Sequence, residues 1–196
     1  MRISKQLRET KETRVELELN LDGGGVPKYE ISTGIKFFDH MLEQFAHHGC
    51  FDLKIKVTSH DLDSHHCVED VALTLGTALK EALGEKRGIV RYSSIILPMD
   101  EALVLSAIDI SGRAFSSVAV DLKDRKTSDF ETVLLAHFFN SFAQNAGLTL
   151  HIKKLDGTDT HHIIEAAFKA TARALKQAVS INTESKNEIP STKGIL

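Results

Sequence analysis

The chain of 196 residues contains two copies of one sequence unit, and this duplication constrains its fold more than any other feature. The motif His-His-x-x-Glu starts at His65 and again at His161, at an offset of 161 − 65 = 96 residues. Two more pairs of segments match in the same order, at offsets of 134 − 37 = 97 and 147 − 49 = 98 residues: FFDHMLEQFA (37–46) with LLAHFFNSFA (134–143), and GCFDLKIK (49–56) with GLTLHIKK (147–154). We therefore expect two halves, residues 1–90 and 91–180, that form one compact domain and precede a tail at 181–196.

Local periodicity gives both halves the same kinds of element. Alternating or continuous apolar residues predict strands at 14–21, 51–57, 101–110 and 148–153, and helical spacing predicts helices at 35–48, 65–83, 129–146 and 161–179. The two shorter helices each end at a glycine, Gly49 or Gly147, which suits the left-handed position after a helix. We predict the α+β class, with two mainly antiparallel β-sheets sandwiching a four-helix layer.

Composition excludes several classes of protein. The 24 Lys and Arg against 27 Asp and Glu give a formal net charge of −3, so the chain lacks the basic surface of a general nucleic-acid binder. No apolar run approaches the roughly 20 residues of a membrane span, and the N-terminal residues do not resemble a signal peptide. The two cysteines are too few for a disulfide framework. We expect a cytoplasmic protein that contacts neither nucleic acid nor membrane.

The repeated motif has the spacing of metal ligands on a helix. Residues at i and i+4 of an α-helix share a face, whereas i and i+1 diverge. His65 and Glu69 can therefore bind one ion, while His66 points elsewhere. The second motif repeats this arrangement.

An approximate twofold relation between the halves would complete each metal site. Each ion would take a His and a Glu from one motif, the divergent His of the other, and one histidine from an upstream helix. The eight candidate ligands are His40, His65, His66, Glu69, His137, His161, His162 and Glu165. They divide into two sets of four, and spacing alone leaves open whether His40 or His137 joins a given set. Imidazole with carboxylate suits divalent metals from Mn to Zn.

The simplest alternative is that a histidine pair at a helix start is a solvated cap, but two matching copies favour ligation. Four histidines have no equivalent in the other half and are expected to be structural or surface residues: His47, His48, His60 and His151. Cys67 faces away from His65 and corresponds to Ile163, so we expect it to pack in the core.

Several segments resemble one known family. FFDHML, HHCVED, LLAHFFNSF, HHIIEAAFKA and the terminal STKG are similar to imidazoleglycerol-phosphate dehydratase, over about residues 8–196. The resemblance implies a duplicated half-domain, a homo-oligomer of 24 subunits with active sites between subunits, and two Mn²⁺ ions per active site. It also implies the ligand sets: His65, Glu69, His137 and His162 for one ion, and His40, His66, His161 and Glu165 for the other.

The implied reaction is the loss of water from imidazoleglycerol phosphate, which gives imidazole acetol phosphate in histidine biosynthesis. The C–H bond to be broken is not next to a carbonyl, so the imidazole ring must assist. A metal-held imidazolate could expel the hydroxyl through a diazafulvene-like intermediate. By resemblance, Glu12 and Glu165 are the candidate catalytic carboxylates, and Gln44 and Asp100 line the substrate pocket with Glu12. Without the resemblance, Glu12 would be read as a solvated side chain.

The substrate's phosphate needs cations and N–H donors. By resemblance, the phosphate-binding residues are Arg91, Arg113, Lys169, Ser191 and Lys193. Lys169 lies at i+4 from Glu165, so an ordinary ion pair is the alternative interpretation. The tail reads as disordered by itself and would become ordered on the substrate's phosphate.

Two other functions use similar residues. A metallohydrolase acting on a phosphoester would also need paired ions, although such sites usually draw more on aspartate than this one does. A non-catalytic shell, in which metal ions only join subunits, is the second alternative.

Overall fold

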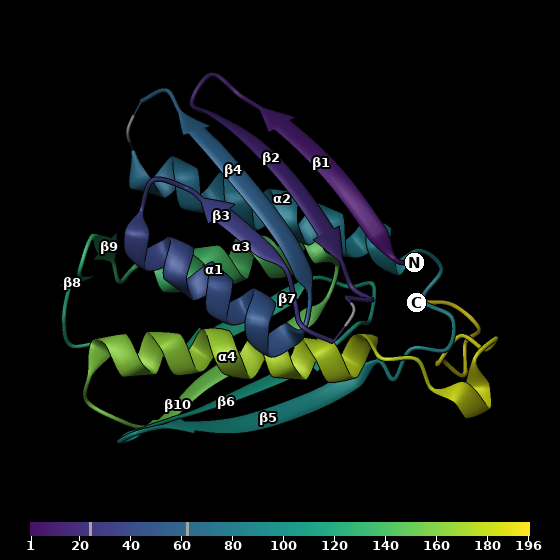
Figure 1. Cartoon of the computed structure of the whole chain (residues 1–196). Helices are drawn as coiled ribbons and strands as arrows, with labels where there is room; N and C mark the ends of the chain where they lie inside the picture. Colours follow the sequence, from purple (N-terminus) through teal and green to yellow (C-terminus); the bar gives the residue numbers. More distant parts are fainter. Residues whose placement is uncertain (24, 62) are drawn as a thin grey trace.

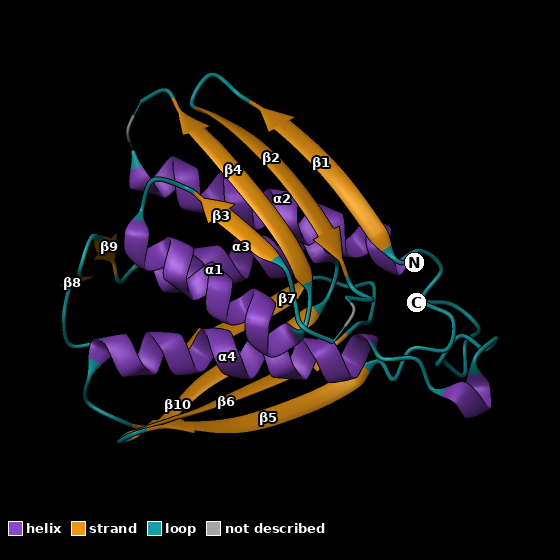
Figure 2. Ribbon diagram, in the orientation of Figure 1, coloured by secondary structure: helices purple, strands orange, loops and turns teal. Residues whose placement is uncertain are grey.

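The computed structural model describes residues 1–23, 25–61 and 63–196. Two four-stranded β-sheets form the outer layers, and the four long helices lie between them (Figures 1 and 2). The predicted sandwich of two sheets around a helical layer is confirmed.

The first half contributes one sheet and two helices. Its elements are β1 (Ile3–Glu9), β2 (Thr13–Asn20), β3 (Tyr29–Ser32), α1 (Lys36–Gly49), β4 (Asp52–Ser59) and α2 (Ser64–Leu83). The strands lie in the order β1-β2-β4-β3, and only the β3–β4 pair is parallel among the described strand pairs of this sheet. That parallel pair is connected through α1, as a crossover requires.

The second half repeats this topology. Its main elements are β5 (Tyr92–Met99), β6 (Ala102–Asp109), β7 (Phe115–Ala119), α3 (Leu134–Ala146), β10 (Thr149–Asp156) and α4 (Thr160–Val179). The strand order β5-β6-β10-β7, with β10 and β7 parallel, matches that of the first sheet. The additions are a short hairpin of β8 (Lys126–Thr127) and β9 (Phe130–Glu131), and a 3₁₀ turn at Thr183–Ser185. The same topology therefore underlies both copies of the repeated sequence.

The helices pair across the two halves. α2 packs against α3, and α1 packs against α4. At the centre, the ring of Phe138 on α3 lies 5.4 Å from that of Phe38 on α1 and 5.1 Å from that of Phe168 on α4. All three rings are fully buried, so aromatic packing joins the halves into one hydrophobic core.

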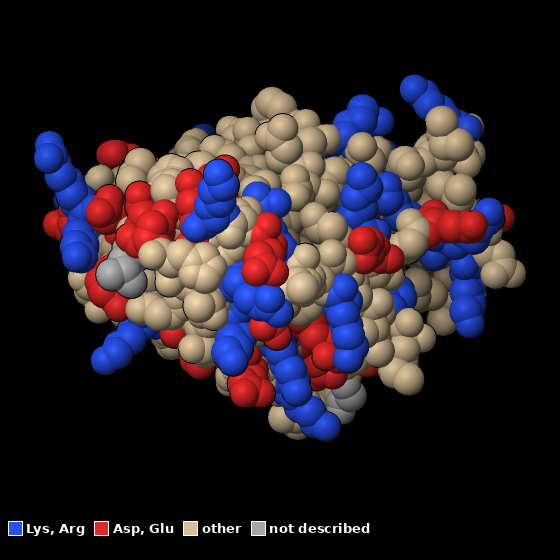
Figure 3. Space-filling view, turned by 90° about the horizontal axis from the view of Figure 1, so that it is seen from above, with Lys and Arg blue, Asp and Glu red and all other residues tan. Residues whose placement is uncertain are grey.

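The outer faces of the two sheets differ. The face of the first sheet carries charges of both signs, which Figure 3 shows interspersed in a view from above, and Lys5 pairs there with Glu18 at 2.9 Å. The second sheet instead exposes large apolar side chains: Tyr92, Ile96, Phe115 and Leu155. The first sheet also exposes Leu7 and Tyr29 among its charges. A group of exposed apolar side chains is typical of a surface that a protein partner covers.

One predicted helix starts later than expected. The periodicity suggested residues 129–146, but α3 begins at Leu134. Asp129 accepts hydrogen bonds from the backbone N–H of Lys36 and Phe37, at 2.8 and 3.0 Å, and so caps the start of α1. Phe130 follows in an extended segment and is completely buried. Apolar spacing cannot separate a helical turn from an extended segment that caps another helix.

The two glycine helix ends also differ from each other. Gly147 adopts the left-handed conformation after α3, with φ of 67°, as predicted. Gly49 instead forms the last residue of α1, and Cys50 takes the left-handed conformation with φ of 52°. An added Cβ on Gly49 would lie 2.4 Å from the ring of Phe51, so this glycine provides space and not a left-handed turn.

The C-terminal tail packs on the segment that joins the two halves. The backbone N–H of Gly88 donates to the carbonyl of Glu188 at 2.8 Å, and the Arg91 guanidinium donates to the carbonyl of Pro190 at 2.7 Å. Ordering of the tail by a bound phosphate stays a prediction. Within the described part of the chain, the helices are too short or too polar to cross a bilayer.

Gly76 allows α2 and α3 to approach closely. An added Cβ would lie 2.6 Å from the carbonyl oxygen of Phe142 and 2.9 Å from the backbone nitrogen of Ala146. We expect Gly76→Ala to lower the free energy of unfolding by about 1–2 kcal/mol, because the clash with the backbone exceeds the gain in helix propensity. Urea denaturation at one fixed protein concentration measures this, since assembly shifts apparent stability.

The control for this prediction is Lys80→Ala on the exposed face of the same helix. That change should leave the free energy of unfolding within about 0.5 kcal/mol of the original value. A Gly76→Ala protein as stable as the unchanged chain would show that the helices can separate without loss.

Candidate active site

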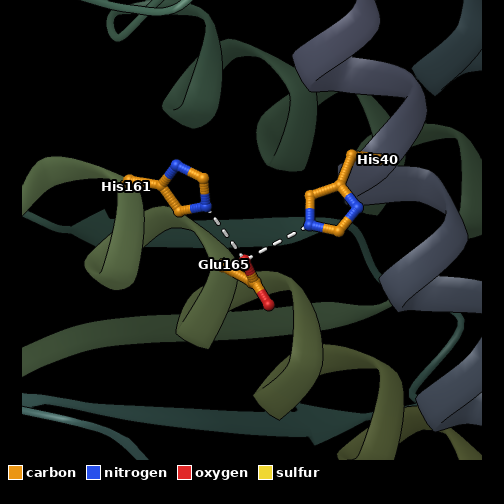
Figure 4. Close-up of side chains that lie close together, drawn as sticks. All are labelled: His40, His161 and Glu165. Atoms are coloured by element: carbon orange, nitrogen blue, oxygen red, sulfur yellow. Dashed lines mark hydrogen bonds and ion pairs between the residues drawn. The ribbon is translucent and has the colours of Figure 1, made fainter.

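Two groups of metal-ligating side chains form where the helices of the two halves pair. The first, here called the α1–α4 triad, consists of His40, His161 and Glu165. Both rings approach the carboxylate of Glu165: Nε2 of His161 lies 3.1 Å from its Oε2, and Nε2 of His40 lies 3.4 Å from the same atom (Figure 4). One oxygen of Glu165 therefore faces two imidazole nitrogens from different halves.

The second group, the α2–α3 triad, consists of His65, Glu69 and His137. Oε2 of Glu69 lies 4.0 Å from Nε2 of His65 and 3.8 Å from Nε2 of His137. In both triads, one ligand-capable atom from each residue lies within 4.8 Å of those of the other two. Nε2 of His137 is buried and has no hydrogen-bond partner among the described residues.

The sequence explains why these side chains converge. Each long helix begins at an aspartate cap, Asp63 or Asp159, whose carboxylate accepts the backbone N–H of the first motif histidine at 2.8 Å. The i, i+4 spacing then places the motif His and Glu on one face. The third member comes from the helix paired across the halves. His40 thus joins the second motif and His137 the first, which is the combination that the family resemblance implied.

The remaining two motif histidines, His66 and His162, lie outside both triads; we call them the divergent histidines. Nδ1 of His66 lies 2.6 Å from Oδ2 of Asp61, and Nδ1 of His162 lies 2.7 Å from Oε2 of Glu101. These hydrogen bonds raise the pKa of both imidazoles above the usual range. One chain therefore brings together three members of each set of four that the family resemblance implies.

Glu101 is ionised over the whole physiological range. Its hydrogen bonds with His162 and with the backbone N–H of Asp159 lower the pKa of its carboxyl to about 2. Asp61 is affected in the same direction, since hydrogen bonds from the backbone of Asp63 and from His66 lower its pKa. Both divergent histidines therefore face permanent carboxylates at neutral pH.

Glu165 stays charged although it is buried. Burial alone would raise the pKa of its carboxyl, but the hydrogen bond and charge of Lys169, together with His40 and His161, lower it overall. Nζ of Lys169 lies 2.5 Å from Oε1 of Glu165, so the ion pair considered from the sequence is present. Glu165 presents its other oxygen to the two histidines and remains an anionic ligand.

Glu12 lies beside a divergent histidine. It occupies the turn between β1 and β2, and its Oε1 is 3.7 Å from Nε2 of His66. The backbone N–H of Glu12 donates to the hydroxyl of Thr10, and Asp70 on α2 accepts a hydrogen bond from Thr13 at 2.5 Å. This network holds the turn against the helix that carries Glu69. The side chain of Glu12 is half-exposed and available to a bound molecule.

The other two predicted pocket residues occupy different surroundings. Gln44 is partly buried on α1, one turn beyond His40. Asp100 is 79% exposed in the β5–β6 turn, and its Oδ2 lies 3.8 Å from Nε2 of His162. Asp100 thus lies at about the same distance from Nε2 of His162 as Glu12 does from Nε2 of His66.

The predicted phosphate ligands lie mostly at the opposite end of α4. The backbone N–H of Arg91 donates to the carbonyl of Ala178, and Leu196 lies against Gly112, next to the exposed Arg113. Ala178 lies 178 − 161 = 17 positions after His161 on the helix, which is roughly 25 Å at 1.5 Å per residue. Ser191 and Lys193 belong to the same end through the tail. Within one chain, these residues do not meet the triads.

Sequence reasoning missed Asp61 and Glu101. Both lie in turns, and neither has the repeat offset of the histidines that it contacts. The only signal in the sequence was that Asp61 lies close to the first motif and Glu101 next to Asp100. This signal is weak, because acidic residues are common in turns. Cys67 is buried, which raises the pKa of its thiol to about 12, in keeping with the packing role expected for it.

The residues fit a pair of divalent ions. Each triad offers two imidazoles and one carboxylate, a donor set that suits Mn²⁺ through Zn²⁺. The unpartnered buried Nε2 of His137 is a polar atom that a metal ion would satisfy.

Comparison with known proteins agrees with this geometry. A family model described as imidazoleglycerol-phosphate dehydratase matches residues 33–175. Two relatives of that name are 52% identical over 100% of this chain and 99% of theirs (Metallosphaera sedula), and 50% identical over 96% and 95% (Desulforamulus reducens).

Solved structures of that enzyme share the fold. The protein from Pyrococcus furiosus superposes with a TM-score of 0.84 at 38% identity, covering 97% of this chain and 100% of that one. The protein from Staphylococcus aureus gives 0.82 at 35% identity, covering 92% and 99%. The chain therefore belongs to the imidazoleglycerol-phosphate dehydratase family and is a hydro-lyase of histidine biosynthesis.

Proposed function

We propose that the chain dehydrates D-erythro-imidazoleglycerol phosphate to imidazole acetol phosphate with two Mn²⁺ ions in each active site. The observation that carries this proposal is the pair of triads, each with two imidazoles and one carboxylate around a common point. The orphaned Nε2 of His137 supports it, because a buried imidazole nitrogen without a partner is unfavourable unless something binds there.

The fourth ligand of each ion comes from another subunit. Each chain holds two triads that each lack a fourth ligand, and it also holds two divergent histidines. Identical chains can therefore supply one divergent histidine to every triad, with none left over. His162 of one copy would complete an α2–α3 triad, and His66 an α1–α4 triad. The apolar outer face of the second sheet supports an assembly, since such a surface is unfavourable in water. The family resemblance favours 24 subunits.

The two triads would hold the ions, which when bound would supply Lewis acidity to the substrate's imidazole ring. The chain's own residues do the rest. Glu12, held in its turn beside His66, accepts the proton of the C–H bond that breaks and returns it to the neighbouring carbon that has lost its hydroxyl. The leaving hydroxyl and the O–H proton of the enol depart together as water. Gln44 and Asp100 line the pocket, and Glu165 keeps one oxygen directed at its histidines through the pairing of the other with Lys169.

The phosphate is bound by residues from a second chain. Arg91 is held by Asp109 at 2.8 Å and by the tail carbonyl of Pro190, so its guanidinium is oriented at the surface where Arg113, Ser191 and Lys193 gather. The separation along α4 supports this division, because a ring on a three-carbon phosphate is far shorter than the roughly 25 Å between the ends. Lys169, which the family resemblance assigns to the phosphate, lies between the two ends and is paired with Glu165.

Removal of metal tests the proposal directly. Treatment with a chelator should abolish dehydration of imidazoleglycerol phosphate, and added Mn²⁺ should restore it, with two ions bound per chain by elemental analysis. The product is assayed both as ketone and as free phosphate. Release of phosphate would favour the metallohydrolase, and no consumption of substrate by the metal-loaded protein would favour the non-catalytic shell.

Glu12 is tested by a near-isosteric change. Glu12→Gln should keep metal content and assembly but lower kcat by about 10²–10⁴-fold, the usual contribution of a general acid–base group. Glu9→Gln, in the same hairpin and paired with Arg14, is the matched control and should turn over normally. Normal turnover by Glu12→Gln would remove this carboxylate from proton transfer.

If each active site contains residues from two chains, two inactive variants should restore activity to each other in a mixed oligomer. His161→Ala and Arg113→Ala should each be inactive as pure oligomers, because each removes one part of every site. Co-assembly of the two variants should restore part of the activity, since some sites would combine an intact His161 with an intact Arg113 from different chains. Mixed oligomers as inactive as their parents would place both residues in a site from one chain.

A further inference from the structure

The two divergent histidines are held at Nδ1 by carboxylates that no motif predicted. The distances are 2.6 Å from Nδ1 of His66 to Asp61 and 2.7 Å from Nδ1 of His162 to Glu101. An ionised carboxylate can only accept a hydrogen bond, so Nδ1 must carry the proton in both rings. In the neutral imidazole, the lone pair then lies on Nε2.

Among the residues that the structure describes, Nε2 of each ring has no carboxylate within hydrogen-bond distance. Its next carboxylate is Glu12 for His66, at 3.7 Å, and Asp100 for His162, at 3.8 Å. Both separations exceed the range of a hydrogen bond. The arrangement thus reserves Nε2, the atom at the tip of the side chain, for a ligand from outside the chain.

The two halves reach this arrangement through different positions. Glu12 directly precedes β2 and Glu101 directly precedes β6, so they occupy matching places in the duplicated fold. Glu12 nevertheless faces Nε2 of its histidine, whereas Glu101 binds Nδ1. In the first half Asp61, from the connection between β4 and α2, binds Nδ1 instead. The carboxylate that binds Nδ1 therefore comes from a different position in each half, so the two cannot both descend from one residue of the duplicated unit.

Both carboxylates are also anchored to the helix that carries their histidine. The other oxygen of Glu101 accepts the backbone N–H of Thr158 and of Asp159, at 3.2 and 2.8 Å. The other oxygen of Asp61 accepts the backbone N–H of Asp63 at 3.1 Å. Asp159 and Asp63 are the caps of α4 and α2. Each carboxylate therefore fixes its imidazole ring relative to the start of the helix.

We propose that Glu101 and Asp61 are positioning residues, which hold the proton of His162 and His66 on Nδ1 and aim Nε2 at the metal ion of a neighbouring subunit. The inference rests on the proposed function for the identity of that ligand. Carboxylates behind metal-ligating histidines fix the tautomer and the ring orientation, and their loss typically lowers metal affinity about 10–100-fold.

Glu101→Gln is the sharpest test. The backbone N–H groups of Thr158 and Asp159 keep the carbonyl oxygen of the glutamine on their side, so its NH₂ group faces Nδ1 of His162. That group can only donate, which forces the proton of His162 onto Nε2. The fold and the anchor are kept while the tautomer is reversed. Asp61→Asn makes the corresponding change at His66.

Two measurements on the assembled protein decide the outcome. Solid-state ¹⁵N NMR of histidine-labelled, metal-free protein reads the tautomer, with His162→Gln used to assign its signals. Titration with Mn²⁺, followed by electron paramagnetic resonance, reads affinity. We expect Glu101→Gln to move the proton to Nε2 and to weaken one of the two ions per chain about 10–100-fold. Glu85→Gln, whose carboxylate pairs with Arg87, should match the unchanged protein in both.

Other results separate the inference from the proposed function. A neutral His162 ring with its proton on Nε2 and not on Nδ1 in the unchanged protein, measured at a pH above the raised pKa of the imidazole, would overturn the positioning role, and so would unweakened Mn²⁺ binding by Glu101→Gln. An unchanged protein that binds no Mn²⁺ would overturn the proposed function, and the NMR measurement would still decide whether Glu101 sets the tautomer.

Discussion

Packing of helices across the two halves is the constraint on which the rest of the structure depends. α1 lies on α4 and α2 lies on α3, and the absence of a side chain at Gly76 lets the second pair approach closely. Each contact places a histidine from a short helix beside a His and Glu from a long one. If either pair of helices shifted, the three residues of its triad would separate even though none of them had been substituted. The hydrophobic core and the candidate metal sites therefore depend on the same helix contacts.

Duplication also explains why one chain brings together only three residues of each ligand set that the family resemblance implies. A helix can present i and i+4 to one ligand but must turn i+1 away, so each motif leaves one histidine outside its own triad. Roughly 25 Å of helix then separates the triads from the arginines near the tail. Both features fit the proposal that the active sites lie between subunits.

Features that repeat along the chain or follow a regular spacing could be predicted from the sequence. The histidine motif, the long helices and the sandwich class all follow from spacing, and the structure has them. What spacing could not show are contacts made by single residues in turns. Asp129 caps a helix of the other half, and Glu101 binds a histidine 61 residues away. Such contacts depend on where distant segments meet, and short acidic turns look alike whether or not they have a partner.

The cap on α1 has a consequence for synthesis. The carboxylate that satisfies the first N–H groups of this helix belongs to Asp129, 93 residues after Lys36. While the ribosome is still making the second half, α1 therefore lacks its cap and its partner helix α4. The first half is a repeat unit by topology, but its first helix is capped and covered only by the second. Exposed apolar surface on a partly synthesised chain favours aggregation, so this arrangement gives chaperones a part in its synthesis.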